Sequence, residues 1–342
     1  MKLAGTMVII MMFSLIQICP AQANSNDQDI PGKTPLMSAS KDDNPAAVED
    51  LLKNGSDIHA TDRKGKTALM YAAHNSSSVV VINVLLKNGA DVNAQDTFGR
   101  TALMYTDHPP TFAALLKGGA DINIQDNRGI TVLMSSQMGS SEAVVNDLLN
   151  NGADINIKDI ENTTALMHAA QQNKINYVAA LIKHGAAAGI NSKDSHGKTP
   201  LMYSAREKIK PENSAAVIPI LLENGADINA QDEFNNTALI HAAQADNIAG
   251  AAVLLDNGAD VNAHDQYGET SLMFASQGWE ENAGMIALLL KHGAELDAQD
   301  NEGWTPLMHA TFNDREVAVA ALQEAGADTT LKNKEGETAA EM

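Results

Sequence analysis

The sequence predicts an all-α repeat solenoid, and three observations lead to this fold class. A short motif built on threonine and leucine recurs along the 342 residues, at intervals of 30 to 38 residues. A second landmark, Gly-Ala-Asp or a variant of it, follows each motif except the last. Aromatic residues make up only 4% of the chain, which suits many short helices better than one large mixed core. Periods of this length indicate units that bury their apolar faces against their neighbours.

The first 23 residues differ from the rest and predict a secretory signal peptide. Lys2 gives a positive start, an apolar run follows, and Ala21 and Ala23 stand in the A-x-A arrangement that precedes a cleavage site. We expect cleavage after Ala23, a short leader over residues 24–28 and the solenoid over residues 29–342. A membrane anchor is the weaker alternative, because the run is shorter than the roughly 20 residues of a spanning helix. A lipid anchor on Cys19 is disfavoured by the bulky Ile18 before it.

Cleavage after Ala23 would remove Cys19, which is the only cysteine. The mature chain would then have no disulfide, no thiolate nucleophile and no cysteine-ligated zinc. An exported protein of this size without cysteine is more typical of bacteria than of eukaryotes, where secreted domains often use disulfides. We therefore expect a periplasmic or secreted bacterial protein with no membrane span after cleavage.

The repeated motif begins the first helix of each unit. Thr67 is a suitable N-cap, because its hydroxyl can accept from a free N–H of the first turn. The next position holds Pro or Ala in most copies, and both fit a first helical turn. Leu69, Ala72 and Ala73 then share one helical face, and the small alanines allow a neighbouring unit to approach closely.

A second helix and an extended finger complete the unit. In VVVINVLLKNG, Val81, Val84 and Leu85 have the spacing of one helical face. Gly89 supplies a left-handed stop at the C-terminal end. The link ADVNAQDTFGRT contains a D-x-x-G turn before the next threonine, which predicts an extended finger.

This order of helix, turn, helix and finger resembles the ankyrin repeat. The resemblance rests on T-P/A-L-x-x-A, V/I-x-x-L-L-x-x-G-A-D-x-N-x-x-D and D-x-x-G, which recur over residues 29–342. It implies about nine full repeats, each a helix-turn-helix with a β-hairpin finger, and a partial C-terminal cap, GETAAEM. We number the repeats from one to nine by their motif threonines, from Thr34 to Thr305, with Thr338 in the cap.

The chain departs from the family pattern at the fourth motif position. The family usually has histidine there, which hydrogen-bonds backbone and helps to set the loops. Here the position holds Met37, Met70, Met104, Met134, Met167, Met202, Met273 and Met308, with Ile240 in the seventh repeat. We expect methionine to be unable to make such a bond, so that packing replaces it.

Four segments depart from the regular spacing. His108-Pro109-Pro110 is expected to end the first helix of the short third repeat early. The sixth repeat carries an insertion, REKIKPENS, and the eighth carries QGWEEN. The finger between Gly185 and Asp194 is two residues longer than its counterparts, so we expect it to bulge.

Charge and motifs argue against several function classes. A formal charge of −20 disfavours nucleic-acid binding, which needs a basic face. The sequence has no G-x-S-x-G, no H-E-x-x-H, no phosphate-binding glycine loop with lysine and no dinucleotide fingerprint. We therefore predict no catalytic residue, no cofactor and no metal site.

Three residue classes have an alternative chemical interpretation. The D-x-x-G aspartates are interpreted as turn formers, because they lack the spacing of a calcium loop. His168, His241 and His309 share one register and are expected to pack between repeats, with a zinc site as the alternative. The methionines are expected to fill the core, with a copper(I) site as the alternative.

Two sets of residues are the candidate protein-binding residues. Basic residues gather around the first four fingers, whereas glutamates dominate the last ones; the basic set is Lys33, Arg63, Lys64, Lys66, Arg100 and Arg128. Scattered solvated charge is the alternative. The aromatic set is Phe98, Phe234, Tyr267, Trp279, Trp304 and Phe312, of which the last four are expected to form one patch. Aromatic side chains are frequent binding hot spots, although some of these could pack under loops.

The resemblance implies a non-catalytic, exported, monomeric protein that binds another protein through its concave face. Similarity to exported bacterial ankyrin proteins suggests two settings, the support of an envelope enzyme and the neutralisation of a toxin delivered into the periplasm. A secreted effector that acts on host proteins is an alternative. A cryptic hydrolase built on Asp, Glu and His is the opposing class.

Overall fold

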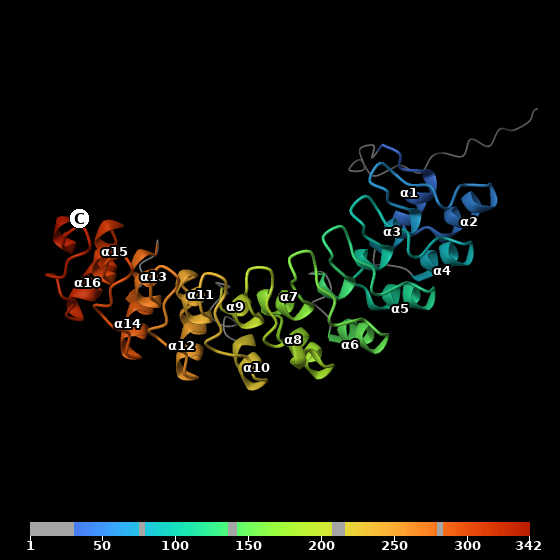
Figure 1. Cartoon of the computed structure of the whole chain (residues 1–342). Helices are drawn as coiled ribbons and strands as arrows, with labels where there is room; N and C mark the ends of the chain where they lie inside the picture. Colours follow the sequence, from blue (N-terminus) through green and yellow to red (C-terminus); the bar gives the residue numbers. More distant parts are fainter. Residues whose placement is uncertain (1–30, 75–78, 136–141, 207–215, 279–282) are drawn as a thin grey trace, which may run out of the picture.

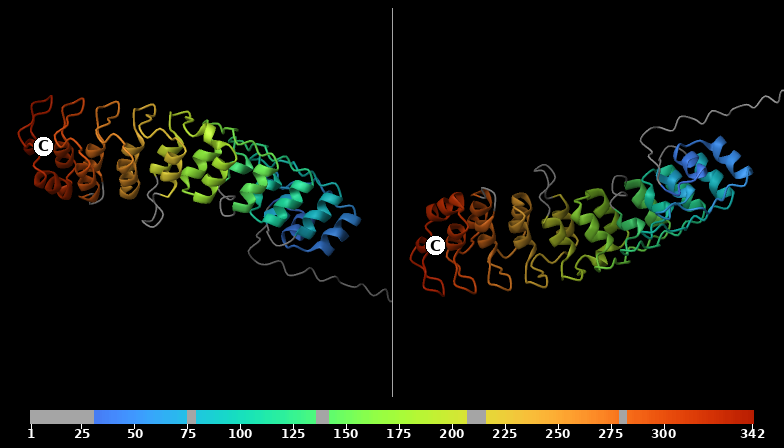
Figure 2. Two further views of the ribbon diagram at one scale, coloured as in Figure 1. Left: turned by 90° about the horizontal axis from the view of Figure 1, so that it is seen from below. Right: turned by 90° about the horizontal axis from the view of Figure 1, so that it is seen from above.

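The computed structural model describes residues 31–74, 79–135, 142–206, 216–278 and 283–342, which form one curved stack of helix pairs (Figure 1). The predicted all-α repeat solenoid is therefore confirmed. The first helices of the pairs lie along the inner, concave side of the arc, and the second helices lie along the outer side (Figure 1). The fingers project from one side of the stack (Figure 2). Residues 1–28, the predicted signal peptide and leader, lie outside the described ranges.

All helices are short and depend on stacking. The inner row consists of α1 (Pro35–Lys41), α3 (Ala68–His74), η1 (Ala102–Tyr105), η2 (Val132–Met134), α7 (Ala165–Gln171), α9 (Pro200–Ala205), α11 (Ala238–Gln244), α13 (Ser271–Gln277), α15 (Pro306–Phe312) and η5 (Ala339–Glu341). The outer row consists of α2 (Pro45–Lys53), α4 (Val79–Lys87), α5 (Pro109–Lys117), α6 (Glu142–Asn150), α8 (Ile175–Lys183), α10 (Val217–Glu223), α12 (Ile248–Asp256), α14 (Ala283–Lys291) and α16 (Glu316–Glu324). Helices of this length are marginal alone in water, so tertiary packing must hold them. Within the described ranges, no helix meets the length and apolarity that a membrane crossing requires.

The core is a continuous layer between the two rows. The motif leucines of the inner row, such as Leu69 and Leu239, are at most 2% exposed. Leucines of the outer row, such as Leu85 and Leu289, are fully buried against them. Each unit contributes the same two positions, so the core extends along the whole stack and has no separate centre.

The helix starts follow the predicted capping. The hydroxyl of Thr67 accepts from Met70 N–H at 3.3 Å, and Pro35, Pro200 and Pro306 occupy the first turn of their helices. Gly89 ends α4 with a φ of 89°, as expected.

The expectation that the motif methionine cannot form a hydrogen bond with the backbone is wrong in five repeats. In each, the backbone N–H of the motif threonine donates to the methionine sulfur, at 3.3–3.4 Å in Thr34–Met37, Thr164–Met167, Thr199–Met202, Thr270–Met273 and Thr305–Met308. Helical side chains point back toward the N-terminus, and the thioether is a weak acceptor, so Sδ reaches the free N–H of the cap. The sulfur therefore contributes to the helix start as well as filling the core.

In the third and fourth repeats, a single 3-10 turn replaces the first α-helix: η1 in the third and η2 in the fourth. η1 ends at Tyr105, with two residues between it and His108-Pro109-Pro110, and Pro109 begins α5, so the predicted early end is confirmed. The fourth repeat shows the same reduction, which the sequence had not predicted: η2 ends at Met134 and Ser135 is extended. Its threonine no longer caps through its side chain, because Met134 N–H donates to the carbonyl of Thr131 at 3.1 Å.

The fingers are held mainly by one another. No regular strand occurs in the described ranges; the expected hairpins are reduced to isolated bridges, Lys158–Thr164 and His264–Thr270. Instead, each finger tip donates to the tip before it, as Thr97 N–H does to Lys64 O at 2.9 Å. Gly65 permits this approach, because its φ is 73° and a Cβ there would lie 2.8 Å from Thr97 N. The long finger after Gly185 contains an extra turn, η4 (Ala186–Gly189), as predicted. The insertions of the sixth and eighth repeats fall largely on residues 207–215 and 279–282, outside the described ranges.

The sulfur bond can be tested with Met167→Leu, which removes the acceptor and nearly conserves the buried volume. We expect the free energy of unfolding to fall by about 0.5–1 kcal/mol, the lower part of the range for one net hydrogen bond. Urea denaturation would measure the change. Met70→Leu is the matched control. Met70 is also buried, but within the described residues its sulfur accepts no hydrogen bond from the N–H of Thr67. Equal losses in the two variants would contradict a role for the sulfur.

Candidate protein-binding surface

One buried aspartate organises each finger. In the second repeat, Asp62 Oδ1 accepts from the backbone N–H groups of Lys64 and Lys66 at 2.8 and 2.9 Å. The same two bonds recur at Asp96, Asp126, Asp159, Asp194, Asp232, Asp265 and Asp300, and Asn333 takes this role in the cap. The D-x-x-G residues therefore form turns, as the sequence analysis predicted.

The second carboxylate oxygen ties the finger to the inner helix nine residues later. Tyrosine hydroxyls donate to it from Tyr71, Tyr105 and Tyr203. Histidine Nε2 lies 2.9–3.0 Å from it at His168, His241 and His309. These histidines were expected to pack between repeats. Each pairs with the aspartate of its own finger, and His309 also contacts Gln277 of the preceding repeat, as expected.

The pair of Asp232 and His241 is the most enclosed of these. His241 is 4% exposed and Asp232 is 6% exposed. Burial alone would raise the pKa of Asp232, but bonds from His241 and from the N–H groups of Asn236 and Phe234 outweigh it and lower the pKa. The carboxylate is therefore held ionised inside the stack.

The basic residues lie beside this register and over it. Lys66 Nζ lies 4.1 Å from the ring centre of Tyr105, and Lys33 Nζ lies 5.3 Å from that of Tyr71. Partial burial lowers the pKa of Lys66, against the opposing effect of Asp96 and Asp62. Arg63 and Lys64 are exposed on the finger. The structure thus separates the predicted basic set into solvated finger cations and cations that cover aromatic rings.

Two members of this set converge on one carboxylate. Arg100 and Arg128 approach Asp126 Oδ2 at 3.9 and 3.7 Å. Arg100 also lies over the ring of Phe98, at 5.7 Å. Asp126 has no tyrosine or histidine partner, because Ser135 occupies the position nine residues later. Beside these residues lies a hollow of about 230 Å³, which the sequence had not predicted.

The aromatic residues are only partly brought together. Trp304 and Phe312 pack edge to face, with ring centres 5.1 Å apart, and Phe312 is 63% exposed. Trp304 also lies 5.3 Å from the ring of His309. Tyr267, Phe98 and Phe234 are exposed on fingers, where no ring contact with this pair is found within the described ranges. Trp279 lies outside the described residues.

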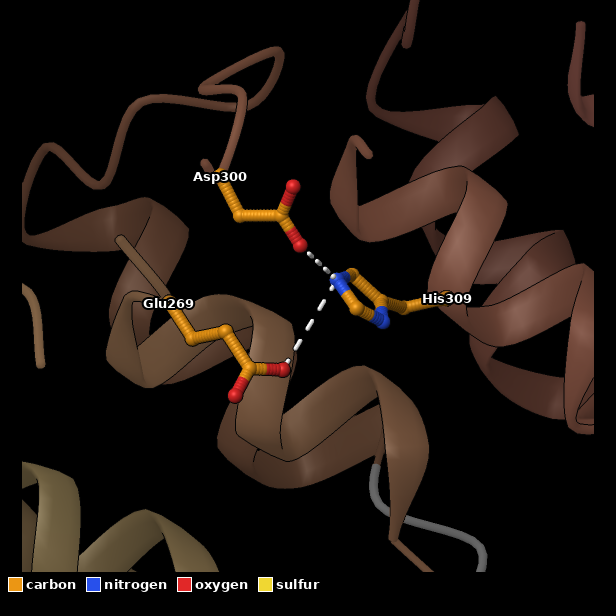
Figure 3. Close-up of side chains that lie close together, drawn as sticks. All are labelled: Glu269, Asp300 and His309. Atoms are coloured by element: carbon orange, nitrogen blue, oxygen red, sulfur yellow. Dashed lines mark hydrogen bonds and ion pairs between the residues drawn. The ribbon is translucent and has the colours of Figure 1, made fainter. Parts of the chain in front are cut away.

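Glu269, Asp300 and His309 form the cluster nearest to a metal-ligand set in the described part of the chain (Figure 3). Their ligand atoms lie within 4.8 Å of one another. His309 Nε2 is 2.9 Å from Asp300 Oδ2 and 3.8 Å from Glu269 Oε1. Gln277 Nε2 donates to Glu269 Oε1 at 2.6 Å and is 3.0 Å from His309 Nδ1. The histidine–aspartate pair repeats in the fifth and seventh repeats without a glutamate, so the repeat architecture accounts for it.

The comparison with protein families gives one result. A family model described as ankyrin repeats, in three copies, matches residues 10–96, 78–159, 134–232, 209–300 and 262–333. These overlapping matches cover nearly the whole chain.

The buried aspartate pairs can be tested with His241→Phe, which removes the Nε2 donor at 2.9 Å and leaves Asp232 only the longer side-chain bonds from Asn236 Nδ2, at 3.3 and 3.5 Å. We expect a loss of about 1–3 kcal/mol in the free energy of unfolding at pH 7. The pKa of Asp232 is lower in the folded state, so its contribution is present above about pH 4 and is lost as the pH falls through the folded pKa. The difference between variant and wild type should therefore shrink in acid, because a protonated Asp232 needs the donor less.

His241→Tyr is the matched control for this variant, because other repeats use tyrosine in the same register. Urea denaturation at several pH values would measure both variants. We expect His241→Tyr to retain most of the stability at pH 7. Equal losses for Phe and Tyr, independent of pH, would contradict the assigned hydrogen bond.

Proposed function

Because the chain belongs to the ankyrin-repeat family, whose repeats are protein–protein interaction modules, we propose that it binds one protein partner along its concave side and catalyses no reaction. The observation that carries the proposal is the pair of Trp304 and Phe312. The pair lies at the C-terminal end of the inner row, and Phe312 leaves 63% of its surface exposed. Clustered, exposed aromatic side chains are typical anchors of protein interfaces.

The charge distribution supports a partner with an acidic segment. Arg63, Lys64 and Arg128 are exposed on the early fingers, whereas Glu233, Glu302 and Glu335 are exposed on the late ones. A charged patch of one sign steers an oppositely charged partner and raises the association rate more than the affinity. We propose that the basic fingers orient the partner and that the aromatic pair anchors it.

Binding without catalysis fits the acidic groups near the aromatic pair. Asp300 and His309 bond to each other, and the carboxylates of Asp300 and Glu269 hold the finger and the side chain of Gln277. These bonds support a structural role for Glu269, Asp300 and His309.

The cellular setting rests on the sequence of the first 23 residues. We propose export to the periplasm or secretion after cleavage at Ala23, and a monomeric mature protein. The partner would be an envelope enzyme that the protein supports or a delivered toxin that it neutralises. A secreted effector acting on host proteins is the alternative.

The aromatic anchor can be tested with the double variant Trp304→Ala, Phe312→Ala. Immobilised mature protein would first capture a partner from periplasmic extract, and mass spectrometry would identify it. Calorimetry with the purified partner should then show a loss of affinity of at least about thirtyfold, as expected for a hot spot worth 2 kcal/mol or more. Unchanged helical circular dichroism would show that the fold is kept.

Ile160→Ala is the control for this variant, because Ile160 is 71% exposed on another finger. It should bind the partner like wild type. Wild-type affinity in the double variant would reject the aromatic anchor.

The steering role can be tested with Arg63→Ser, Lys64→Ser. We expect the association rate to fall roughly tenfold at low salt and the difference to fade at high salt, because screening removes long-range attraction. Stopped-flow kinetics would measure it. Lys332→Ser, Lys334→Ser changes the net charge equally at the last finger and should affect the rate much less. Equal effects of the two double variants would mean that only net charge matters.

A further inference from the structure

The strongest unassigned feature is the hollow in the fourth repeat. It lies between the fingers and the inner row, where η1 and η2 replace full helices. Its volume is about 230 Å³, and its lining includes Arg100, Asp126, Thr131 and Ser135. It therefore opens toward the side of the solenoid on which binding is proposed.

The hollow coincides with a missing side chain in the repeat pattern. From the second repeat to the ninth, the residue after the motif Met or Ile is large in every repeat but one: Tyr71, Tyr105, His168, Tyr203, His241, Phe274 and His309. Within this range the fourth repeat alone has a small side chain there, Ser135, which lines the hollow; the first repeat, at the start of the stack, also has serine, Ser38. Among the residues that the structure describes, none fills the space that a large side chain fills in these other repeats.

Two buried polar groups at the hollow lack the partners that their counterparts have. Asp126 is 8% exposed, and within the described ranges its Oδ2 faces only the two guanidinium groups at 3.7 and 3.9 Å, beyond hydrogen-bond distance. The hydroxyl of Thr131, which is 1% exposed, has no hydrogen-bond partner in the described part of the chain, because the N–H of Met134 donates to the Thr131 carbonyl instead. A hydroxyl donor placed in the hollow would supply the bond that Asp62, Asp96 and Asp194 receive from a tyrosine of their own repeat.

The two preceding repeats show what surrounds a tyrosine at this position. Lys33 of the first repeat covers the ring of Tyr71 in the second, and Lys66 of the second covers Tyr105 in the third. Arg100 of the third repeat occupies the same register as Lys66, directly before the motif threonine. It stands next to the hollow of the fourth repeat with no tyrosine of that repeat to cover.

We infer that this hollow receives a tyrosine side chain from the protein partner, and this inference rests on the proposed function. The phenol hydroxyl donates to Asp126 Oδ2, and the ring lies against Arg100 as the ring of Tyr105 lies against Lys66. An inserted carboxylate fits less well, because Asp126 already opposes both guanidinium groups and would repel it. The partner completes the fourth repeat with the residue type that the chain itself uses in the third.

The chemistry of the hollow can be tested with N-acetyl-tyrosinamide as the probe. Met104 and Met134 line the hollow, so their methyl signals report on it in spectra of full-length mature protein with methyl-labelled methionine. We expect these signals to shift with the probe and to shift about tenfold less readily with N-acetyl-phenylalaninamide, which lacks one hydrogen bond to a charged group. Shifts with acetate in place of the tyrosine probe, or no shift with either, would overturn the inference.

Substitutions at two positions, Asp126 and Ser135, test the inference further. Asp126→Asn should remove the preference for tyrosine and keep the finger, because Asn333 makes the same two backbone bonds in the cap. Ser135→Tyr should fill the hollow from within, abolish the probe shifts and raise the melting temperature above that of Ser135→Phe. Ser135→Ala keeps the hollow and should bind the probe like wild type. Probe binding that survives Ser135→Tyr would overturn the inference.

Partner binding separates this inference from the proposed function. If a captured partner binds wild type and Ser135→Ala alike but binds Ser135→Tyr at least about tenfold more weakly, both proposals are supported. If Ser135→Tyr binds the partner like wild type, the hollow is not used and only this inference fails. If no partner binds wild type, the proposed function fails, and the probe spectra still report the chemistry of the hollow.

Discussion

The carboxylate of the finger aspartate is the interaction on which the rest of the repeat depends. One oxygen closes the turn by accepting two backbone N–H groups, and in six of the described fingers the other oxygen bonds to a tyrosine or histidine on the inner helix nine residues later. A buried charge is tolerated only where such bonds replace its lost hydration. The position of the finger and the position of the helix are therefore set together. A backbone N–H of each finger tip then donates to a carbonyl of the preceding tip, so the position of each repeat is fixed relative to the one before it.

The methionine at the fourth motif position changes how the helix start is completed. Methionine sulfur is a weaker acceptor than an imidazole nitrogen, yet five of these side chains accept the N–H of the capping threonine. In the third and fourth repeats the 3-10 turn replaces the side-chain cap with a backbone bond. The cap is thus the more adjustable part of the unit, whereas the finger aspartate keeps its two backbone bonds throughout the described fingers.

Much of the fold follows from local sequence signals. The period, the threonine caps, the glycine stops, the early end at His108-Pro109-Pro110 and the extra turn after Gly185 all depend on residues close in sequence. The aspartate–tyrosine and aspartate–histidine pairs could not be predicted as easily, because they depend on the path of the finger between them. Their signal was the fixed spacing of nine residues, which is visible once both positions are aligned. The 3-10 turn at η2 had a weaker signal: Val132 replaces Pro or Ala in the first turn, and Ser135 stands where others have a large side chain.

The candidate binding residues were harder to place because exposure depends on neighbours. Trp304 and Phe312 are eight residues apart in sequence. Trp304 ends the finger just before the start of α15, and Phe312 lies in the last turn of that helix, where the two rings meet. Lys66 and Arg100 share a register, yet one covers a tyrosine and the other adjoins a hollow, since the repeat that follows each of them differs. We infer that a binding site can form where the finger aspartate keeps its two backbone bonds but the tyrosine or histidine nine residues later is absent. Asp126 meets that condition, because the turn and the two guanidinium groups hold its carboxylate in place while one oxygen remains within reach of a ligand.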